Sequence, residues 1–511
     1  MLKEHENIII RLRENEVQDT LIYALYGTGE GADIIYDAFS EMKLAHCIQY
    51  VIDRDDSDLL GTEYRGIKIQ KLSEVYEKVD CIIIAAKIYY QVVTRRVKAF
   101  LDSKKSDKKI INIYAYNSRK EKEEYVEYIE KSVLKVSEDF VDFSKTEYRR
   151  DTCDSKIIAW YLPQFHQMEI NNKFHGQGFT EWTNSSRAIP LFVGHYQPHI
   201  PYDVGYYDLT NLDSFKRQIY LAKHYGIFGF CFHYYWFSRK RIMETPIELF
   251  LKHKELDMPF CLNWATENWT ALWDGGNKEI MYEQKLNEGD DKLFFQDILP
   301  YFKDERYIKI DGRPILSIYR CDMFEKEEFA AFLNRLRQYA KSEGFPDLFV
   351  LLTTAGRFDG NEKAWGVDAI VEFPPWKISL GLKNIRPNGY LNPYFEGRIM
   401  DAKPLIDNKG YMMHHASQCY FRSALTSFDN TARKCTTGAQ MYLGLNPDTY
   451  KVWLKDILRE SKRIHDKSHD FVFVNSWNEW AEGSHLEPDM KYGYAYLQAT
   501  KEALEEVRSI V

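Results

Sequence analysis

The 511-residue sequence has no long apolar run and no cluster of basic residues. A helix that crosses a bilayer needs ~20 apolar residues, and no stretch comes near that length. The start, MLKEHENIIIRLRENE, has too short an apolar core for a signal peptide. The formal net charge of −8 argues against a nucleic-acid partner. We therefore expect a cytoplasmic protein with no transmembrane segment and no bound nucleic acid.

Closely spaced cysteine pairs are also missing. The eight cysteines are scattered, and several, such as Cys81 in CIIIAA and Cys231 in FGFCF, lie in apolar runs. They are typical of reduced, buried thiols. Five histidines are candidates for metal ligands, but they lack the tight spacing of zinc ligands, so no metal is predicted. They are His166, His175, His195, His199 and His233.

Aromatic residues are plentiful. They make up 15% of the chain, with 36 Tyr, 30 Phe and 11 Trp. Sugars present C–H faces that stack on aromatic rings, so an aromatic cleft suits a carbohydrate, although a large core would use the same residues. Hydrophobic residues at 45% and charged residues at 28% indicate a folded globular protein. The length predicts two or more domains.

Residues 1–117 alternate strand and helix patterns. Apolar strands are expected at 21–26, 47–53, 81–86 and 110–114, which predicts a small Rossmann-like parallel α/β domain. The charged stretch that follows, 118–154, reads as a helical linker.

The first predicted strand is followed by a glycine-rich turn. Gly27 and Gly29 open a helix, and Asp53 ends the second strand, which is the context of a nucleotide-binding loop. Glu30, however, lies inside the loop, where its carboxylate would repel a pyrophosphate. A bound nucleotide cofactor at Gly27, Gly29 and Asp53, a scaffold and a partner-docking role all stay open.

From residue 155 to the C-terminus, short apolar strands recur between helical stretches. Eight candidates alternate with helices, which predicts a (β/α)₈ TIM barrel with insertions; an open doubly wound sheet is the alternative. The seventh candidate is poorly defined. The eight candidates are 156–162, 227–234, 259–265, 313–319, 347–353, 368–373, a segment near 411–428, and 471–477.

Barrel enzymes place their active-site residues after the carboxyl ends of the strands. Polar and aromatic residues gather there in this sequence, and two further motifs, GFTEW and WATENW, pair Glu with Trp, as a sugar site can. The predicted substrate-binding residues are His166, Glu181, Trp182, His233, Tyr234, Trp236, Asn263, Trp264, Glu267, Trp269, Trp480 and Glu487.

Two carboxylates after the last strand are the predicted catalytic pair. Glu479 and Glu482, in NSWNEWAEGSHLEP, are three residues apart, so one helical turn would place them on the same side. Two carboxylates held close together in a cleft cannot both ionise easily, so one pKa rises. Glycosidic bond chemistry requires such an acid and base.

From about residue 156 onward the chain resembles the WbsX-like family, which is labelled glycosyltransferase and is related to glycoside hydrolase family 99. Seven blocks carry the resemblance in one order. They are AWYLPQFH (159–166), GFTEW (178–182), GHYQPHIPYDVGYYDL (194–209), FCFHYYWF (230–237), NWATENWTALWDG (263–275), DNTAR (429–433) and NSWNEWAEGSHLEPD (475–489).

The resemblance implies a barrel enzyme that acts on glycosidic bonds with retention, as family 99 relatives do on internal α-mannosidic linkages. It implies that Glu479 deprotonates the sugar 2-hydroxyl, which attacks C1 to form a 1,2-anhydro intermediate. Glu482 would protonate the leaving oxygen and then activate water or an acceptor hydroxyl.

The expected function is the making or breaking of glycosidic bonds in a bacterial surface polysaccharide, such as O-antigen or capsule. An oligosaccharide or polysaccharide is the expected partner, together with association with a polysaccharide-assembly complex. Hydrolysis and glycosyl transfer stay open. The alternatives are a non-catalytic glycan-binding protein and a nucleotide-dependent oxidoreductase that uses the N-terminal domain.

Overall fold

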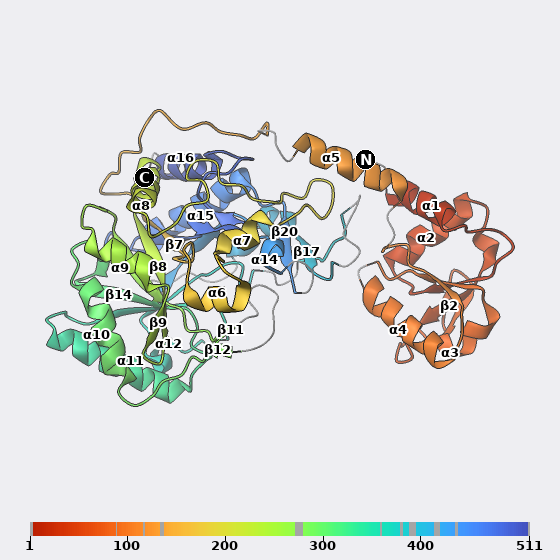
Figure 1. The fold of residues 1–511 in the computed structure, drawn as a ribbon, viewed down its shortest axis with the longest axis horizontal. Helices are drawn as coiled ribbons and strands as arrows, with labels where there is room; N and C mark the ends of the chain where they lie inside the picture. The colour runs from red at the N-terminus through yellow and green to blue at the C-terminus, as the bar shows by residue number, and fades with distance from the viewer. Residues whose placement is uncertain are drawn as a thin grey trace.

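The chain forms two bodies joined by a helix (Figure 1). The computed structural model describes residues 4–87, 89–115, 118–132, 137–270, 280–357, 360–378, 382–387, 395–412, 419–434 and 438–508. Helix α5 (Arg119–Ser132) runs between the smaller N-terminal unit and the larger unit. Each unit has its own cluster of buried apolar side chains. No helix within the described ranges is long and apolar enough to cross a bilayer.

The N-terminal unit is a six-stranded sheet in the order β3-β4-β2-β1-β5-β6. Its strands are parallel except for the β3–β4 pair. From β1 the chain first adds β2 and β4 on one side and later β5 and β6 on the other, as in a Rossmann-like sheet. This order confirms the predicted small parallel domain. The elements are α1 (Glu4–Glu14), β1 (Tyr23–Tyr26), α2 (Glu30–Glu41), β2 (Ile48–Asp53), β3 (Glu63–Tyr64), β4 (Ile67–Lys71), α3 (Leu72–Val75), β5 (Cys81–Ile84), α4 (Tyr90–Ser103) and β6 (Lys109–Ile111).

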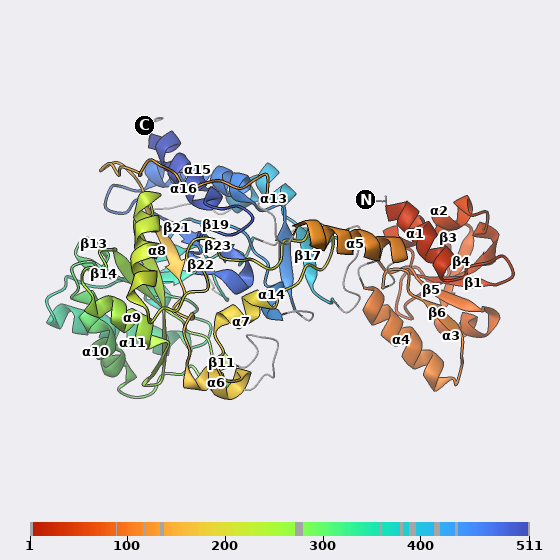
Figure 2. The same ribbon diagram turned by 45° about the horizontal axis from the view of Figure 1, so that its top comes forward.

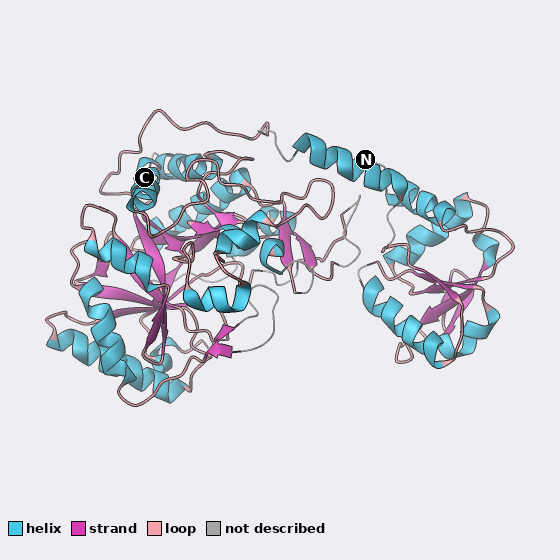
Figure 3. Cartoon of the chain, viewed as in Figure 1, coloured by secondary structure: helices cyan, strands magenta, loops and turns pink. Residues whose placement is uncertain are grey.

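The larger unit is a parallel barrel, seen nearly end-on in Figure 3. Its strands follow the order β18-β16-β15-β14-β10-β8-β7-β21-β19. β18 and β19 are separated by Arg422 alone, so they occupy one position and the ring has eight, which confirms the predicted barrel. The strands are β7 (Lys156–Tyr161), β8 (Gly229–Phe237), β10 (Phe260–Trp264), β14 (Arg313–Ile318), β15 (Phe349–Thr353), β16 (Ala369–Val371), β18 (Tyr420–Phe421), β19 (Ser423–Leu425) and β21 (Phe471–Asn475).

The seventh strand is interrupted, which explains its weak sequence pattern. The backbone carbonyl of Arg422 still accepts a hydrogen bond from the Phe473 N–H at 2.9 Å, so the ladder continues through the break. The Arg422 side chain pairs with Glu372 and Glu460. Residues 413–418 of the predicted strand segment lie outside the described residues, as do 271–275 of the fifth block of the family resemblance.

Helices surround the barrel in the alternating order that the sequence predicts (Figures 1 and 2). α8 shows why: the Asn211 side chain caps its first turn, and Phe215, Ile219 and Ala222 are buried on one face. The helices are α8 (Leu212–His224), α9 (Glu244–Lys252), α10 (Asp290–Phe302), α11 (Lys326–Ser342), α12 (Glu362–Trp365), α13 (Lys403–Asp407), α15 (Pro447–Ile464) and α16 (Ala495–Arg508).

Shorter elements are inserted at the strand ends. These are α6 (Glu169–His175), α7 (Glu181–Ser186), β9 (Lys240–Ile242), β11 (Trp269–Thr270), β12 (Ile280–Tyr282), β13 (Lys309–Ile310), β17 (Arg398–Asp401), α14 (Thr431–Lys434), β20 (Gln440–Leu443), β22 (Asn478–Glu479) and β23 (Ser484–His485).

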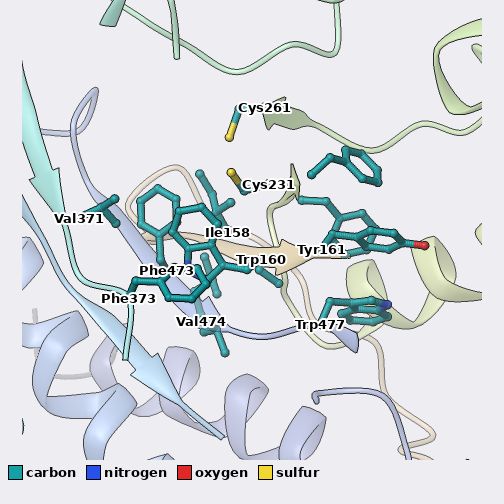
Figure 4. Packing of buried hydrophobic residues seen from close by; sticks show 14 of the residues in the cluster. Ile158, Trp160, Tyr161, Cys231, Cys261, Val371, Phe373, Phe473, Val474 and Trp477 are labelled. Atoms are coloured by element: carbon teal, nitrogen blue, oxygen red, sulfur yellow. The ribbon is translucent and has the colours of Figure 1, made fainter. Parts of the chain in front are cut away.

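The barrel core alternates between inward and outward side chains (Figure 4). On β7, Trp160 packs against Phe373 and Phe473, each at a ring distance of 5.0 Å. Its neighbour Tyr161 instead stacks against Phe215 of α8. Successive residues of a strand point to opposite faces of the sheet, so one face of each strand fills the barrel and the other packs on the helices.

Candidate active site

A cleft of about 1010 Å³ lies at the carboxyl ends of the barrel strands, where barrel enzymes carry their active sites. It is lined by side chains that follow β7, β10, β14, β16 and β21, by the end of β8 and by the inserted helices α6, α7 and α14. The lining residues are Leu162, Gln164, Asn171, His175, Phe179, Glu181, Asn184, His233, Tyr235, Phe237, Met243, Ala265, Glu267, Asn268, Trp269, Thr270, Tyr319, Phe373, Arg433, Asn475, Glu479 and Glu482.

The turn after β21 carries both candidate catalytic carboxylates, for which we call it the catalytic turn, and it is bonded to its surroundings on both sides. The Trp477 N–H donates to the Trp160 carbonyl at 2.8 Å. The Asn478 side chain accepts from the Leu162 N–H at 2.8 Å and donates to the Leu162 carbonyl at 3.0 Å. The Ser476 hydroxyl accepts from the Glu479 N–H at 2.9 Å. Glu479 therefore has a fixed position at the end of β7.

Arg433 connects three carboxylates of the cleft. Its Nη2 donates to Glu479 and Glu181, each at 2.7 Å, and its Nη1 donates to Glu482 at 2.8 Å. The guanidinium is buried. The two candidate catalytic groups are thus bonded to the two terminal nitrogens of one guanidinium, which holds both at the same part of the cleft.

Burial and crowding determine the charge of Glu479. Removal from water raises the pKa of its carboxyl to about 8, and the nearby Glu482 and Glu181 carboxylates act in the same direction. Arg433 and a hydrogen bond from Gln164, 3.0 Å from Glu479, oppose the rise. One cation cannot neutralise three carboxylates, so the upward direction of the shift follows from the charge balance.

The two carboxylates differ in exposure. The Glu482 side chain is 23% exposed and the Glu479 side chain is 8% exposed. Glu482 therefore meets the solvent side of the cleft, whereas Glu479 lies deeper. A fourth acid of the cleft, Glu267, pairs with Arg320, and burial raises its pKa while that ion pair opposes the rise.

Polar groups also lie on the inward face of the neighbouring strands. His233 on β8 pairs in register with Asn263 on β10, and both side chains are buried. Within the described part of the chain, His233 Nδ1 and both amide atoms of Asn263 have no hydrogen-bond partner. Burial lowers the pKa of His233 to about 4, so its imidazole is neutral. His233 therefore offers the cleft a neutral polar side chain.

Residues 194–203, which we call the strap, run against the catalytic turn. The Nε2 atom of His195 lies 2.6 Å from a carboxylate oxygen of Asp429, and the Gln197 amide donates to the same oxygen at 3.1 Å. His195 Nδ1 accepts from the Leu191 N–H, so the Nε2–H is the donor to Asp429. The Asp429 N–H in turn donates to the Glu482 carbonyl at 2.7 Å. The strap thus supports both Glu482 and the start of α14, which carries Arg433.

Three groups with metal-ligand chemistry lie together where the strap meets the catalytic turn. His199, His485 and Asp489 are buried, with their ligand atoms within 4.8 Å of one another. His199 Nδ1 and His485 Nε2 are 2.8 Å apart, and His485 Nδ1 lies 2.9 Å from the Glu487 carbonyl. Burial lowers the pKa of both imidazoles. A chain of neutral histidines, each donating through Nδ1–H, satisfies both distances.

The structure brings six of the sequence-predicted residues into the cleft and leaves eight outside its lining. Those in the lining are Glu181, His233, Glu267, Trp269, Glu479 and Glu482. Those outside it are His166, Trp182, Tyr234, Trp236, Asn263, Trp264, Trp480 and Glu487, all of them buried.

The alternation of side chains explains most of these placements. β8 continues to Phe237, beyond its predicted end at residue 234, so Tyr234 and Trp236 are strand residues that point outward. Trp236 contacts Phe294 of α10 and donates to Asp297. Their neighbour Tyr235 points inward and lines the cleft. Trp264 of β10 also packs on Phe294, at 4.5 Å.

Glu487 lies beneath the catalytic turn rather than in the cleft. Four donors reach its carboxylate: the Trp480 and Trp477 indoles, the Gln218 amide and the Tyr207 hydroxyl, at 2.7–3.1 Å. Burial raises its pKa to about 7, and the hydrogen bonds oppose the rise. Trp182 also packs here, 5.6 Å from Trp480. These side chains form the support of the catalytic turn.

Sequence reasoning missed several residues of the cleft, above all Arg433, together with Gln164 and Tyr319. Arg433 lies in DNTAR and Gln164 in AWYLPQFH, both of which are blocks of the family resemblance. The signal that could have marked Arg433 is its place in a block of the family resemblance, where it is a cation able to balance the clustered carboxylates. No pattern marks Tyr319, which follows β14 as an ordinary apolar continuation.

The glycine loop of the N-terminal unit has the backbone of a nucleotide-binding loop but not the positive charge that a pyrophosphate requires. Gly27 has a φ of +110°, and a Cβ at Gly31 would lie 2.3 Å from the Ala85 carbonyl, so both positions require glycine. Gly29 caps α2. Lys87, beside the loop, is bonded to Glu4 and Glu30 at 2.9 and 3.1 Å.

Asp53 is likewise engaged, because its carboxylate accepts from the Ser57 hydroxyl and the Arg54 N–H. With a carboxylate in the loop and Lys87 already paired, these residues do not fit a pyrophosphate group. A nucleotide at Gly27, Gly29 and Asp53 is therefore not part of the mechanism that we derive.

A (β/α)₈ barrel with clustered carboxylates and aromatic rings at its carboxyl face is an arrangement that carbohydrate-active enzymes use. The sequence model described as "Glycosyltransferase WbsX" matches residues 157–500. The chain therefore belongs to the WbsX glycosyltransferase family.

Two relatives and two solved structures are similar to the chain. "Uncharacterized protein WxcX" from two strains of Xanthomonas campestris pv. campestris is 35% identical over 357 residues, 69% of this chain. This chain spans about half the length of those relatives. A glycoside hydrolase-like protein aligns over 72% of this chain and 98% of its own, with 14% identity and a TM-score of 0.44. A GH99 endo-alpha-mannosidase from Bacteroides thetaiotaomicron aligns over 71% and 99%, with 13% identity and a TM-score of 0.43.

Proposed function

We propose that this protein makes or breaks glycosidic bonds, with Glu479 as the base and Glu482 as the general acid and base. The observation that carries the proposal is the bonding of both carboxylates to Arg433 in an aromatic cleft at the carboxyl ends of the barrel strands. Glycosidic chemistry needs two carboxyl groups in different protonation states at one bond.

The different depths of the two groups support different roles. Glu479, which is deeper, would remove the proton of the sugar 2-hydroxyl, and its raised pKa makes it a stronger base once ionised. The 2-oxygen attacks C1 as the bond from C1 to the leaving oxygen breaks. Glu482, which is more exposed, would give its proton to that leaving oxygen. The product is a 1,2-anhydro sugar, as the family resemblance implies.

The second half of the reaction reverses these proton transfers. The oxygen of an incoming hydroxyl group attacks C1 and gives its proton to Glu482. At the same time the bond from C1 to the 2-oxygen breaks, and the 2-oxygen recovers a proton from Glu479. Water as the incoming group gives hydrolysis, and a sugar hydroxyl gives transfer. The exposure of Glu482 supports this exchange, because the group that assists departure must also meet the incoming molecule.

The proposed substrate is an oligosaccharide or polysaccharide of a bacterial surface glycan such as O-antigen or capsule. We further propose that the protein acts in the cytoplasm together with a polysaccharide-assembly complex. In this proposal residues 1–117 form a Rossmann-like domain, residues 118–154 form a helical linker, and residues 155–511 form the catalytic domain. Membership of the WbsX glycosyltransferase family supports a role in glycan metabolism.

The proposal is tested by incubating the protein with α-linked oligosaccharides and with nucleotide- or lipid-linked sugars, followed by mass spectrometry of the products. Glu482→Gln keeps the shape of the side chain and removes the transferable proton, so turnover should fall by at least ~100-fold. Asp297→Asn, which alters a carboxylate outside the cleft that bonds Trp236, is the control. Undiminished turnover in Glu482→Gln would refute the assignment.

A further inference from the structure

A second hollow, of about 830 Å³, lies beside the catalytic cleft. It is built mainly by the segment after β16, by α13 with the turn that follows it, and by Trp453 of α15. Its lining residues are Thr354, Glu372, Pro374, Trp376, Lys377, Ile378, Leu382, Pro404, Leu405, Asn408, Gly410, Tyr411, Tyr420 and Trp453.

The hollow and the cleft are lined by neighbouring residues of the segment after β16. Phe373 lines the cleft, whereas Pro374 and Trp376 line the hollow. The Pro374 carbonyl accepts from the Asn475 side chain at 2.6 Å, and Asn475 belongs to the cleft. The wall between the two spaces is therefore fixed to the catalytic strand β21.

Trp376 stands on the shared rim. Its indole N–H donates to the hydroxyl of Tyr319, a cleft residue, at 3.3 Å. The Arg320 guanidinium lies over one face of the ring, 5.9 Å from the ring centre. Trp376 is nevertheless 42% exposed. The ring thus has a defined orientation and an open apolar surface, which is the arrangement that a sugar face requires.

The rest of the hollow offers hydrogen-bonding groups next to apolar surface. Glu372 accepts from Arg422 and from the Tyr420 hydroxyl, so its carboxylate is held in place. The Asn408 side chain is exposed, and its amide can both donate and accept. Tyr411 stacks on Trp453 at 4.6 Å and closes the wall. A ligand rich in hydroxyls matches this mixture of groups.

We infer that the hollow is a second sugar-binding site, in which Trp376 stacks on a sugar unit of the same glycan whose bond lies in the cleft. The inference rests on the proposed function, because continuity with the cleft is what identifies the occupant. It deepens that function by making the substrate an oligosaccharide or polysaccharide long enough to reach beyond the rim, rather than a single activated sugar.

The test measures binding as a function of chain length. Isothermal titration calorimetry uses α-linked manno-oligosaccharides and α-linked gluco-oligosaccharides of two, four and six sugars. In the unsubstituted protein, affinity should rise with length. Trp376→Ala should weaken binding of the longest members about 5- to 10-fold and leave the two-sugar members unchanged. Trp376→Phe, which keeps a stacking ring, should retain most of the affinity.

Tyr220→Ala is the matched control, because Tyr220 is 46% exposed and lies on α8 away from both spaces. Circular dichroism checks that each variant is folded. Equal weakening at every length would place Trp376 in the cleft and overturn the second site, as would a flat length dependence in the unsubstituted protein. This experiment measures binding, whereas the catalytic proposal is tested by turnover. The two can therefore fail separately: Glu482→Gln can lose turnover while Trp376→Ala leaves the binding of long chains unchanged, and Trp376→Ala can weaken that binding while Glu482→Gln keeps its turnover.

Discussion

At the scale of single residues, the balance between Arg433 and its three carboxylate partners governs the cleft. Arg433 bonds Glu181, Glu479 and Glu482, so full ionisation of the three acids would leave two uncompensated negative charges. Burial and the neighbouring carboxylates therefore raise the pKa of Glu479. Glu479 and Glu482 thus hold one proton between them, and the proposed reaction uses the form in which that proton lies on Glu482.

This raised pKa predicts the pH dependence of turnover. The reaction needs one proton on the pair of carboxyls, so kcat/KM should fall as the pH rises through about 8, where that proton is lost. The measurement is the kcat/KM profile from pH 5 to 10 on the oligosaccharide that shows turnover. Gln164→Leu removes a hydrogen bond to the ionised form and should move the falling limb to higher pH. A profile that instead rises through this range would show that no protonated carboxyl takes part.

At the scale of elements, the strap and α14 form one support for the catalytic groups. His195 bonds Asp429, the Asp429 N–H bonds the Glu482 carbonyl, and Asp429 also accepts from the Thr431 N–H at the start of α14. Burial alone would raise the pKa of Asp429, but His195 and Thr431 lower it to about 2. Asp429 is thus a buried anion that depends on its donors.

Replacing His195 tests this support. His195→Phe keeps the ring that stacks on Phe192 and removes the donor to Asp429, so the free energy of unfolding should fall by about 1–3 kcal/mol. Because Glu482 and Arg433 lose a common anchor, kcat should fall more than KM rises. Urea denaturation and steady-state kinetics measure the two effects. His253→Phe, at a half-buried histidine that bonds Glu255, is the control; equal effects in both variants would contradict a specific role.

Elements also show where prediction from the sequence succeeds. The strand–helix alternation predicted the barrel and the Rossmann-like sheet, because apolar runs and helical stripes are local patterns. The same patterns do not state where a strand ends. β8 extends three residues past its predicted limit. Along this extension Tyr234 and Trp236, which were predicted to bind substrate, point outward, and Tyr235, which was not predicted, lines the cleft. Arg433 was missed because its partners are 46 to 252 residues away in the chain, a relation that only folding creates.

At the scale of the whole molecule, polar contacts join the two units in the described part of the chain, among them a hydrogen bond from Arg386 to the Tyr114 carbonyl. Gln91 of α4 donates to the Phe395 carbonyl at 3.2 Å, and Arg95 pairs with Glu396 near the surface. The Tyr125 hydroxyl of α5 donates to the Pro190 carbonyl. Exposed ion pairs contribute about 0–1 kcal/mol, and the apolar clusters of the two units are separate. Such contacts orient the units but do not merge their cores.

The two units should therefore unfold in separate transitions, which differential scanning calorimetry detects. Leu25→Ala, at a fully buried position of β1, should lower the temperature of one transition only. Leu316→Ala, equally buried in β14, should lower that of the other. Each substitution removes a large side chain from a packed core and costs about 2–5 kcal/mol, so the shifts should be similar in size but belong to different peaks. A single transition that moves in both variants would mean that the contacts through α4 and α5 couple the N-terminal sheet to the barrel.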